Sequence, residues 1–365
     1  MKIAEILHCL ECLADPALQE NYDNTGLLTG NPVWECPGVL VTLDATEEVV
    51  EEAAALNCNL IVAHHPIIFH GLKKITGRNY VEKTVISAIK KDIAIYAIHT
   101  NLDNILAGVN GRMADRLGLV DRKIISPRPG SLRKIYTFAP LDYAEKVRAA
   151  LFEAGAGHIG NYSETSFNSE GSGTYKAGSE ASPFLGKKGE RHTEKETRVE
   201  VIFPSYLQQK VIKALLEAHP YEEVAYDVVS LGNADQSVGS GLWGRLPEKM
   251  KEQAFLAFVR ERFQLPLIRH TRLNDRAVEN VALCGGAGSF LIFNALSLAV
   301  DFFITSDIKY HEFFEANDQM VIADIGHFES EQFTVELIHD KLREKFPNFA
   351  VLKSGVKTNP VHYYL

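Results

Sequence analysis

Two kinds of segment alternate along the first third of the chain. Apolar runs at 39–43 and 60–63 end in polar residues, whereas 47–56 and 81–91 carry apolar residues at helical spacing. Short apolar runs bounded by turns are typical of buried strands, and a spacing of three and four residues is typical of amphipathic helices. The pattern predicts an α/β fold with a parallel sheet.

The first candidate site lies at the end of the predicted strand 60–63, where His64 and His65 precede Pro66. Pro66 prevents a central strand from continuing and biases His65 toward an extended backbone, so both imidazoles can converge on one cleft. Ligands of open α/β sheets bind at the carboxyl ends of strands. The alternative is a buried core histidine beside an unused one, because neighbouring strand residues point to opposite faces.

A second apolar run, 93–98, also ends in polar residues. It is followed by His99 and Asp103, and the helical segment 81–91 separates it from the first strand. Strands joined by such a helix lie parallel and present their ends at one edge. Asp103 is therefore a candidate metal ligand, and His99 is a candidate to support a ligand or carry a proton. The alternative role of Asp103 is a helix cap or an Asx turn.

The third piece is a strand at 319–324 that turns through Gly326 into a helix bearing His327 and Glu331. Residues at i and i+4 lie on one helix face. Each has a simpler explanation, since Glu331 matches the helix dipole and His327 suits a cap. Histidines and carboxylates from three strand ends together suit zinc, manganese or iron.

The pattern changes in the middle of the chain. The order strand, helix, strand, helix, strand predicts an inserted ferredoxin-like domain at 131–246, which divides the metal-binding unit into 1–130 and 247–365. The segment 155–191 is rich in glycine, serine and charge, which indicates long loops or a mobile hairpin. The elements expected in the insert are 133–139, 143–154, 197–203, 205–218 and 224–229.

Other polar motifs flank the predicted strands. The glycine-rich turn 285–288 lacks the Walker lysine, so a tight strand-to-helix turn is favoured over a phosphate cradle. Asp23 and Asn24 belong to a loop that lines the site edge or makes turn hydrogen bonds. The candidate substrate contacts after the strand 301–305 are Ser306, Asp307, Lys309, Tyr310 and His311.

Composition limits the class of protein. The chain has 365 residues, 46% of them hydrophobic, which suits two or three domains with real cores. The net charge of −9 argues against a nucleic-acid-coating role and leaves a small-molecule site open. No signal peptide or membrane span is evident, and the five scattered cysteines do not form a disulfide framework. We expect a cytoplasmic protein.

Two weaker clusters have structural explanations. Cys9 and Cys12 form a C-x-x-C within the first predicted helix, and helix packing is favoured over redox or metal chemistry because no second pair follows. His219, Glu222 and Glu223 surround Pro220 at a helix-to-strand connection, where a metal site is the less favoured hypothesis.

The motifs together resemble the GTP cyclohydrolase 1 type 2 homologue family, in its variant with an inserted domain similar to PII and CutA-type domains. The matching stretches are 21–26, 63–69, 99–104, 305–311 and 324–331. The resemblance implies a three-layer α/β unit and two divalent ions per chain, zinc before iron or manganese. It also implies a homohexamer. The implied ligands are His64, His65, Asp103, His327 and Glu331.

The resemblance further implies how the ligands divide between the ions. His65 and Asp103 are expected to hold one ion and His64 and His327 the other, with Glu331 as the bridge. Such a pair activates water and polarises a substrate oxygen. The favoured hypothesis is hydrolysis of a nucleotide or related heterocycle, with His99 or Glu331 carrying the proton.

Two alternatives to the hydrolase remain open. The first is a non-catalytic metal-binding or regulatory oligomer whose insert senses a small molecule, and it predicts a site with no open coordination position. The second is a ring associated with nucleic acid, which the acidic balance makes the least favoured.

Overall fold

The computed structural model describes residues 1–364, which form two compact units. Unit 1 joins Met1–Pro127 to Gln236–Leu365, and unit 2 is Arg128–Asp235. Residues 236–246, which the sequence pattern placed in the insert, belong to unit 1, because β10 (Gly239–Lys251) pairs there with β12 and β5.

The first sheet of unit 1 has the order β1-β4-β3-β2-β15. Strands β15, β2, β3 and β4 run parallel, and β1 is antiparallel to β4. The strands are β1 (Gly26–Thr29), β2 (Val39–Asp44), β3 (Leu60–His65), β4 (Ala94–Ala97) and β15 (Val351–Lys353).

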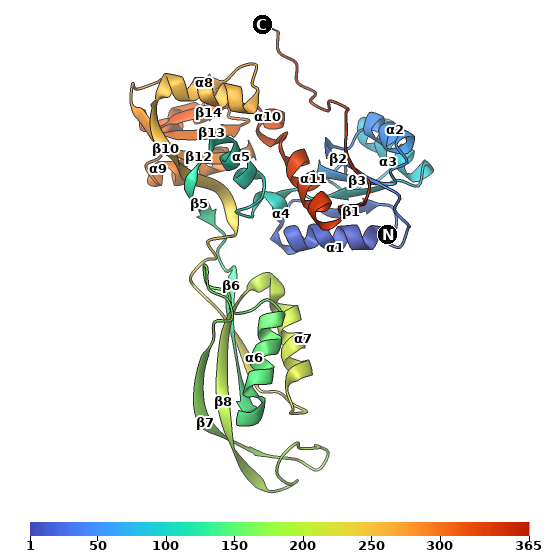
Figure 1. Ribbon diagram of the computed structural model, residues 1–365, viewed down its shortest axis with the longest axis vertical. Coiled ribbons are helices and arrows are strands. Elements are labelled where there is room, and N and C mark those ends of the chain that lie inside the picture. The colour runs from blue at the N-terminus through green and yellow to red at the C-terminus, as the bar shows by residue number, and fades with distance from the viewer. Residues whose placement is uncertain (365) are drawn as a thin grey trace. The chain divides into compact units, whose positions relative to one another are not determined.

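Helices cover both faces of this sheet because successive strand residues point in opposite directions. Val39 and Val41 pack on one side with α1 and α11, while Leu40 packs on the other with α2 and α3. Figure 1 shows α2 and α3 beside β2 and β3. The helices are α1 (Ile3–Leu13), α2 (Glu47–Ala55), α3 (Tyr80–Lys90) and α11 (Thr334–Lys345).

The second sheet of unit 1 has the order β11-β14-β13-β12-β10-β5. Its β12, β13 and β14 are parallel, and β10 is antiparallel to both of its neighbours. Helices α5 and α8 pack on one face and α9 on the other. The elements are β5 (Val120–Pro127), β11 (Arg269–His270), β12 (Ala277–Ala287), β13 (Phe302–Ser306), β14 (Val321–Asp324), α5 (Val109–Leu117), α8 (Glu252–Phe263) and α9 (Ile292–Ser297).

Two short helices begin just after parallel strands of the two sheets. Helix α4 (Thr100–Asp103) follows β4, and α10 (His327–Glu331) follows β14 through Gly326. Gly326 has φ +91°, a backbone conformation that favours glycine. The carboxyl ends of strands in both sheets of unit 1 thus deliver polar residues to one place.

Unit 2 is a four-stranded antiparallel sheet with the order β7-β8-β6-β9, covered by two helices. Its core contains Ile135, Val199 and Val201 from the strands and Val147 and Leu215 from the helices. Part of the glycine-rich segment 155–191 is a strand, paired with β8 along its length. The elements are β6 (Leu132–Pro140), α6 (Ala144–Glu153), β7 (Phe167–Lys176), β8 (Arg191–Pro204), α7 (Gln208–Ala218) and β9 (Tyr226–Ser230).

Candidate metal centre

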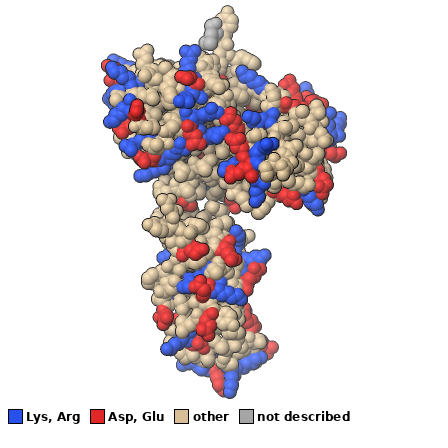
Figure 2. Space-filling view, viewed as in Figure 1, with Lys and Arg blue, Asp and Glu red and all other residues tan. Residues whose placement is uncertain are grey.

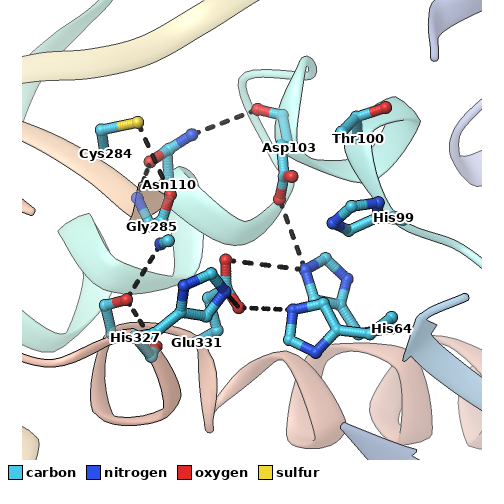
Figure 3. A network of polar contacts seen from close by, with 12 residues as sticks. His64, His99, Thr100, Asp103, Asn110, Cys284, Gly285, His327 and Glu331 are labelled. Carbon is cyan, nitrogen blue, oxygen red and sulfur yellow. Dashed lines mark hydrogen bonds and ion pairs between the residues drawn. The ribbon is translucent and has the colours of Figure 1, made fainter. Parts of the chain in front are cut away.

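The predicted ligands converge within unit 1. Figure 3 shows His64, Asp103, His327 and Glu331 directed toward one region. Three overlapping groups of side chains bring their donor atoms within 4.8 Å of one another. These groups are His64 with Asp103 and Glu331, His65 with His327 and Glu331, and His64 with His65 and His99.

A hydrogen bond at Nδ1 orients each of three histidines, namely His64 and His65 at the end of β3 and His327 at the start of α10. His64 Nδ1 lies 2.8 Å from the carbonyl oxygen of Ile98, which can only accept a hydrogen bond. Nδ1 therefore carries the proton, and Nε2 presents its lone pair to the site. Fixing the ring through its other nitrogen is how proteins prepare histidine to bind metal.

Carboxylates orient the other two rings in the same way. His65 donates from Nδ1 to Asp44 Oδ1 at 2.7 Å, and His327 donates from Nδ1 to Asp307 Oδ2 at 2.6 Å. Thr358 holds the second oxygen of Asp44 at 2.6 Å. Sequence analysis did not single out Asp44, although it directly follows the predicted strand 39–43. The parallel pairing of that strand with β3 is the signal that places Asp44 beside His65.

Glu331 faces both groups with different oxygens. Its Oε1 lies 3.9 Å from His64 Nε2. Its Oε2 lies 2.9 Å from His65 Nε2 and 3.2 Å from His327 Nε2. A carboxylate in this position, 2% exposed, has one oxygen for each group of nitrogen donors.

The polar atoms of the first group fit a cation. Within residues 1–364, His64 Nε2 and Asp103 Oδ1 are buried with no hydrogen-bond partner, and they lie 3.6 Å apart. Buried polar atoms are nearly always satisfied, so two unpaired acceptors that face each other are suited to a positive ligand between them. Imidazole nitrogen and carboxylate oxygen suit zinc, iron and manganese.

The donor atoms that lie together in the structure are grouped differently from the ligand sets that the family resemblance implies. The structure puts His64 with Asp103, and His65 with His327, rather than the reverse. The reason is local, because neighbouring residues of β3 point to opposite faces. The Ile98 carbonyl aims the His64 ring toward α4, and Asp44 aims the His65 ring toward α10.

The electrostatics of the cluster favour charge pairing. Burial would raise the pKa of Glu331, but hydrogen bonds from His327 and His65 hold it well below its usual range. Burial lowers the histidine pKa values, yet hydrogen bonds to carboxylates outweigh it and raise that of His65 to about 9 and that of His327 to about 11. Burial raises the pKa of Asp103. A metal must therefore compete with protons on His65 and His327.

His99 forms a dyad with a carboxylate beside this cluster. Its Nδ1 donates to Asp23 Oδ1 at 2.8 Å, and its ring centroid lies 5.2 Å from that of His64 and 5.3 Å from that of His65. Thr100 donates both its backbone N–H and its hydroxyl to Asp23 Oδ2. Asp23, which sequence analysis left between a structural and a site-edge role, positions His99.

The glycine-rich turn belongs to the same site. The N–H of Gly285 donates to Asn110 Oδ1 at 2.9 Å, and that of Gly286 donates to Ser330 Oγ at 3.0 Å. Both amides are committed within the fold, which favours the tight-turn interpretation over the phosphate cradle. Gly286 has φ +63°, and a Cβ there would overlap Glu331 Oε1 and lie 3.4 Å from His327 Cε1.

A cleft of about 830 Å³ opens beside the second group. His65, His327 and Asp307 contribute to it, while Pro66, Phe69 and Tyr80 give it an apolar wall. Of the substrate contacts proposed from sequence, only Asp307 is among its lining residues. Ser306 is fully buried, and Tyr310 is 72% exposed elsewhere on the surface.

Neither of the two weaker clusters forms a metal site among residues 1–364. His219 uses both ring nitrogens, since Nε2 lies 3.0 Å from Phe138 O and Nδ1 accepts from Tyr221 N. Cys9, within α1, packs against the core, and Cys12 Sγ lies 3.7 Å from His8 Nε2. All five cysteines are free thiols.

Two α/β sheets with a histidine and carboxylate cluster at their strand ends define a candidate metal-binding protein. A family model for Duf34/NIF3 (NGG1p interacting factor 3) matches residues 1–360, and the chain belongs to this family. The resemblance inferred from the motifs is thereby confirmed. Curated relatives carry the same name that the motifs suggested.

Two of these relatives are called GTP cyclohydrolase 1 type 2 homolog. The one from Halalkalibacterium halodurans is 38% identical over 368 residues, 99% of each chain. The one from Bacillus subtilis is 36% identical and covers 98% of this chain and 97% of its own. The crystal structure of a Bacillus cereus protein related to NIF3 is 37% identical, covers 100% of this chain and 99% of its own, and has a TM-score of 0.86.

Two surface properties of the chain complete the description. No helix within residues 1–364 has the length and apolar character needed to cross a bilayer. Acidic and basic side chains are interspersed on the face drawn in Figure 2.

Proposed function

We propose that this protein binds two divalent ions and uses them for hydrolysis. One ion would lie between His64 and Asp103, the other between His65 and His327, with Glu331 bridging. The observation that carries this proposal is the position of Glu331, whose Oε1 faces His64 and whose Oε2 faces His65 and His327. Two dications need such a shared negative charge, and zinc is the first candidate, before iron or manganese.

The proposed chemistry is hydrolysis of a nucleotide or related heterocycle. Each group offers three protein donors, and a catalytic site with three keeps a position for water or substrate. When bound, the ions would lower the pKa of water and polarise a substrate oxygen. The apolar wall of the cleft beside His65 suits the flat face of a heterocycle.

The protein's own proton carrier in this scheme is His99. Asp23 accepts from Nδ1, so Nε2 is left to take a proton from the nucleophile and return it to the leaving group. Asp23 holds the ring in this tautomer and stabilises the imidazolium that forms. Glu331 is excluded from this role in our proposal, because both of its oxygens are committed to the ligand groups.

The assembly proposed from the family resemblance is a homohexamer. The observation that supports association is a set of exposed aromatic residues on α9, the turn before it and the neighbouring turn 312–316. Phe293 is 66% exposed and Phe314 is 66% exposed. Sedimentation should give about six times the 40.6 kDa chain mass, and a mass of one chain would refute the proposal.

Three finer structural assignments belong to the same proposal. We propose that unit 1 is a three-layer α/β unit, since α1 and α11 oppose α2 and α3 across its first sheet. We propose a ferredoxin-like insert of the PII and CutA type, on the strand order β7-β8-β6-β9. A cytoplasmic location agrees with the free cysteines.

Metal content and turnover test the proposal together. Elemental analysis of protein purified without added metal should give about two ions per chain, falling in Glu331→Ala and His64→Ala. Glu344→Ala, an exposed change on α11, is the matched control and should keep both ions. A panel of nucleotides then tests hydrolysis that depends on the metal.

The outcomes separate the two functions. Two ions with metal-dependent hydrolysis support the hydrolase. Two ions without turnover on any substrate favour the regulatory oligomer. No bound metal after zinc, iron and manganese are added back would refute the metal centre itself.

A further inference from the structure

Unit 2 contains a cavity of its own, separate from the metal centre. It has a volume of about 660 Å³ and lies between β7, the loop that follows β7 and the turn after α7. Cavities of about 300–1,000 Å³ are the usual size of small-molecule sites. All of its lining residues belong to unit 2, so the cavity is complete within that unit.

The loop over the cavity is held in place by specific hydrogen bonds. The hydroxyl of Tyr175 donates to the Leu185 carbonyl at 2.8 Å, and the N–H of Ser182 donates to Glu222 Oε2 at 2.7 Å. The first joins the loop to β7, and the second joins it to the turn after α7. The loop after β7, which lies in the segment expected to be long loops or a mobile hairpin, is therefore fixed as a wall of the cavity.

Aromatic rings supply much of that wall. The ring centroids of Tyr175 and Tyr221 lie 6.0 Å apart at 62°, and those of Phe184 and Tyr221 lie 6.3 Å apart at 49°. Such tilted rings do not cover one another face to face. Aromatic faces carry negative potential, which attracts a cation or the edge of another ring.

A buried carboxylate lies among these rings. Glu196 on β8 is 8% exposed, and its Oε1 accepts from the Tyr221 hydroxyl at 2.8 Å. Gly173 on β7 makes room for it, because a Cβ there would lie 2.8 Å from Glu196 Cδ and overlap Oε2. Burial and the Glu196 charge raise the pKa of Tyr221 above its usual range. A carboxylate held away from water favours a positive partner.

The net charge of the other lining residues is also negative. Glu170, Glu222 and Glu223 contribute carboxylates, whereas the basic residues are Lys176 and Arg198. The partners of the Arg198 guanidinium are not lining residues, since it lies 3.0 Å from Glu200 and 4.3 Å from the centroid of the Tyr136 ring. The cavity is therefore aromatic and acidic.

We propose that this cavity binds a small organic cation with an apolar or aromatic body and a protonated amine or amidine nitrogen. The nitrogen would pair with Glu196, and the body would pack among Tyr175, Phe184 and Tyr221. This inference goes beyond the metal-dependent function, because none of its residues takes part in the metal centre.

Three probes of equal shape test the proposal on the unaltered full-length chain. Benzamidine is a planar cation that can donate two hydrogen bonds to a carboxylate, benzamide is its neutral counterpart and benzoate carries the opposite charge. Calorimetric titration should give benzamidine at least about tenfold tighter binding than benzamide, with no detectable binding of benzoate. Equal binding of all three, or of none, would overturn the proposal.

Two variants and their controls place the binding in this cavity. Glu196→Gln should weaken benzamidine at least about tenfold, because it removes the charge and keeps the shape. Glu217→Gln, which removes an exposed carboxylate of α7, should leave binding unchanged. An unchanged affinity in Glu196→Gln, with unit 2 folded by circular dichroism, contradicts the assignment.

A second pair remains informative if Glu196→Gln does not fold. Phe184 is 45% exposed, so Phe184→Ala removes a cavity wall with little cost to the core. It should weaken benzamidine by about three- to fivefold. Phe167→Ala, at a 67% exposed position on β7 outside the lining, is the matched control. Equal affinities of the two variants would also overturn the proposal.

Discussion

Gly286→Ala should remove metal from this protein while leaving its fold intact. A Cβ at Gly286 would overlap Glu331 Oε1 and lie 3.4 Å from both Glu331 Cδ and His327 Cε1. Restoring an ordinary carbon-to-oxygen contact requires Oε1 to move by about 1 Å. Metal-to-oxygen bonds tolerate only about 0.2 Å. The carboxylate cannot turn aside freely, because His65 and His327 hold its other oxygen.

The backbone gives this variant a second cost, which a control can isolate. Gly286 has φ +63°, where alanine is less stable than glycine by about 1 kcal/mol. Gly118 has φ +65° at the end of α5, with no heavy atom within 4 Å of a Cβ. Gly118→Ala therefore repeats the backbone cost without the overlap.

Two assays, of stability and of zinc affinity, should distinguish Gly286→Ala from Gly118→Ala. Urea unfolding in the presence of a chelator should show a loss of about 1 kcal/mol in the free energy of unfolding for Gly118→Ala. The loss should be larger for Gly286→Ala, because its Cβ also displaces Glu331. Competition with a zinc chelator should show at least about 100-fold weaker binding for Gly286→Ala alone, which is about 2.7 kcal/mol. If Gly286→Ala binds zinc within about threefold of Gly118→Ala, the position assigned to Glu331 is wrong.

Three further predictions concern the supporting carboxylates and the bridge. Asp44→Asn should weaken metal binding by about 10- to 100-fold in a chelator competition, because Asp44 orients His65; unchanged affinity would contradict that role. Burial raises the pKa of Asp23, but bonds from His99 and Thr100 lower it from 3.8 to about 2. A carboxyl with a lowered pKa stabilises the fold above pH 4, where it is ionised in both states. The free energy of unfolding should therefore fall by about 2 kcal/mol between about pH 4 and pH 2. In urea titrations Asp23→Asn should lose less over that interval. Glu331→Ala should bind no zinc but keep, in chelator, the circular dichroism spectrum of the unaltered protein. A variant that is unfolded even in the presence of zinc would show that Glu331 serves the fold rather than the metal site.

The chain's local patterns were sufficient to predict most of the elements. The strands β2 and β3 and the helices α2 and α3 follow from apolar periodicity, which depends only on neighbouring residues. His64 and His65 at a strand end, and His327 and Glu331 one helical turn apart, were candidates for the same reason. For the segment 155–191 the sequence left long loops and a hairpin open, and β7 pairs with β8 as a hairpin does. The bounds of β7 were not predicted, because its glycines and serines carry no apolar alternation.

The sequence by itself determined which residue types stand at each strand end. Only the tertiary structure decided which of them meet, because packing brings together residues that local patterns cannot relate. His65 and Glu331 are separated by 266 residues, and Thr358 and Asp44 by 314. Which donor atoms lie together, His64 with Asp103 and His65 with His327, likewise depends on the hydrogen bond that fixes each ring. The bonds of His64 and His65 form within the first sheet, and that of His327 forms beside the second. Only the packing of the two sheets then brings Glu331 to His64 and His65.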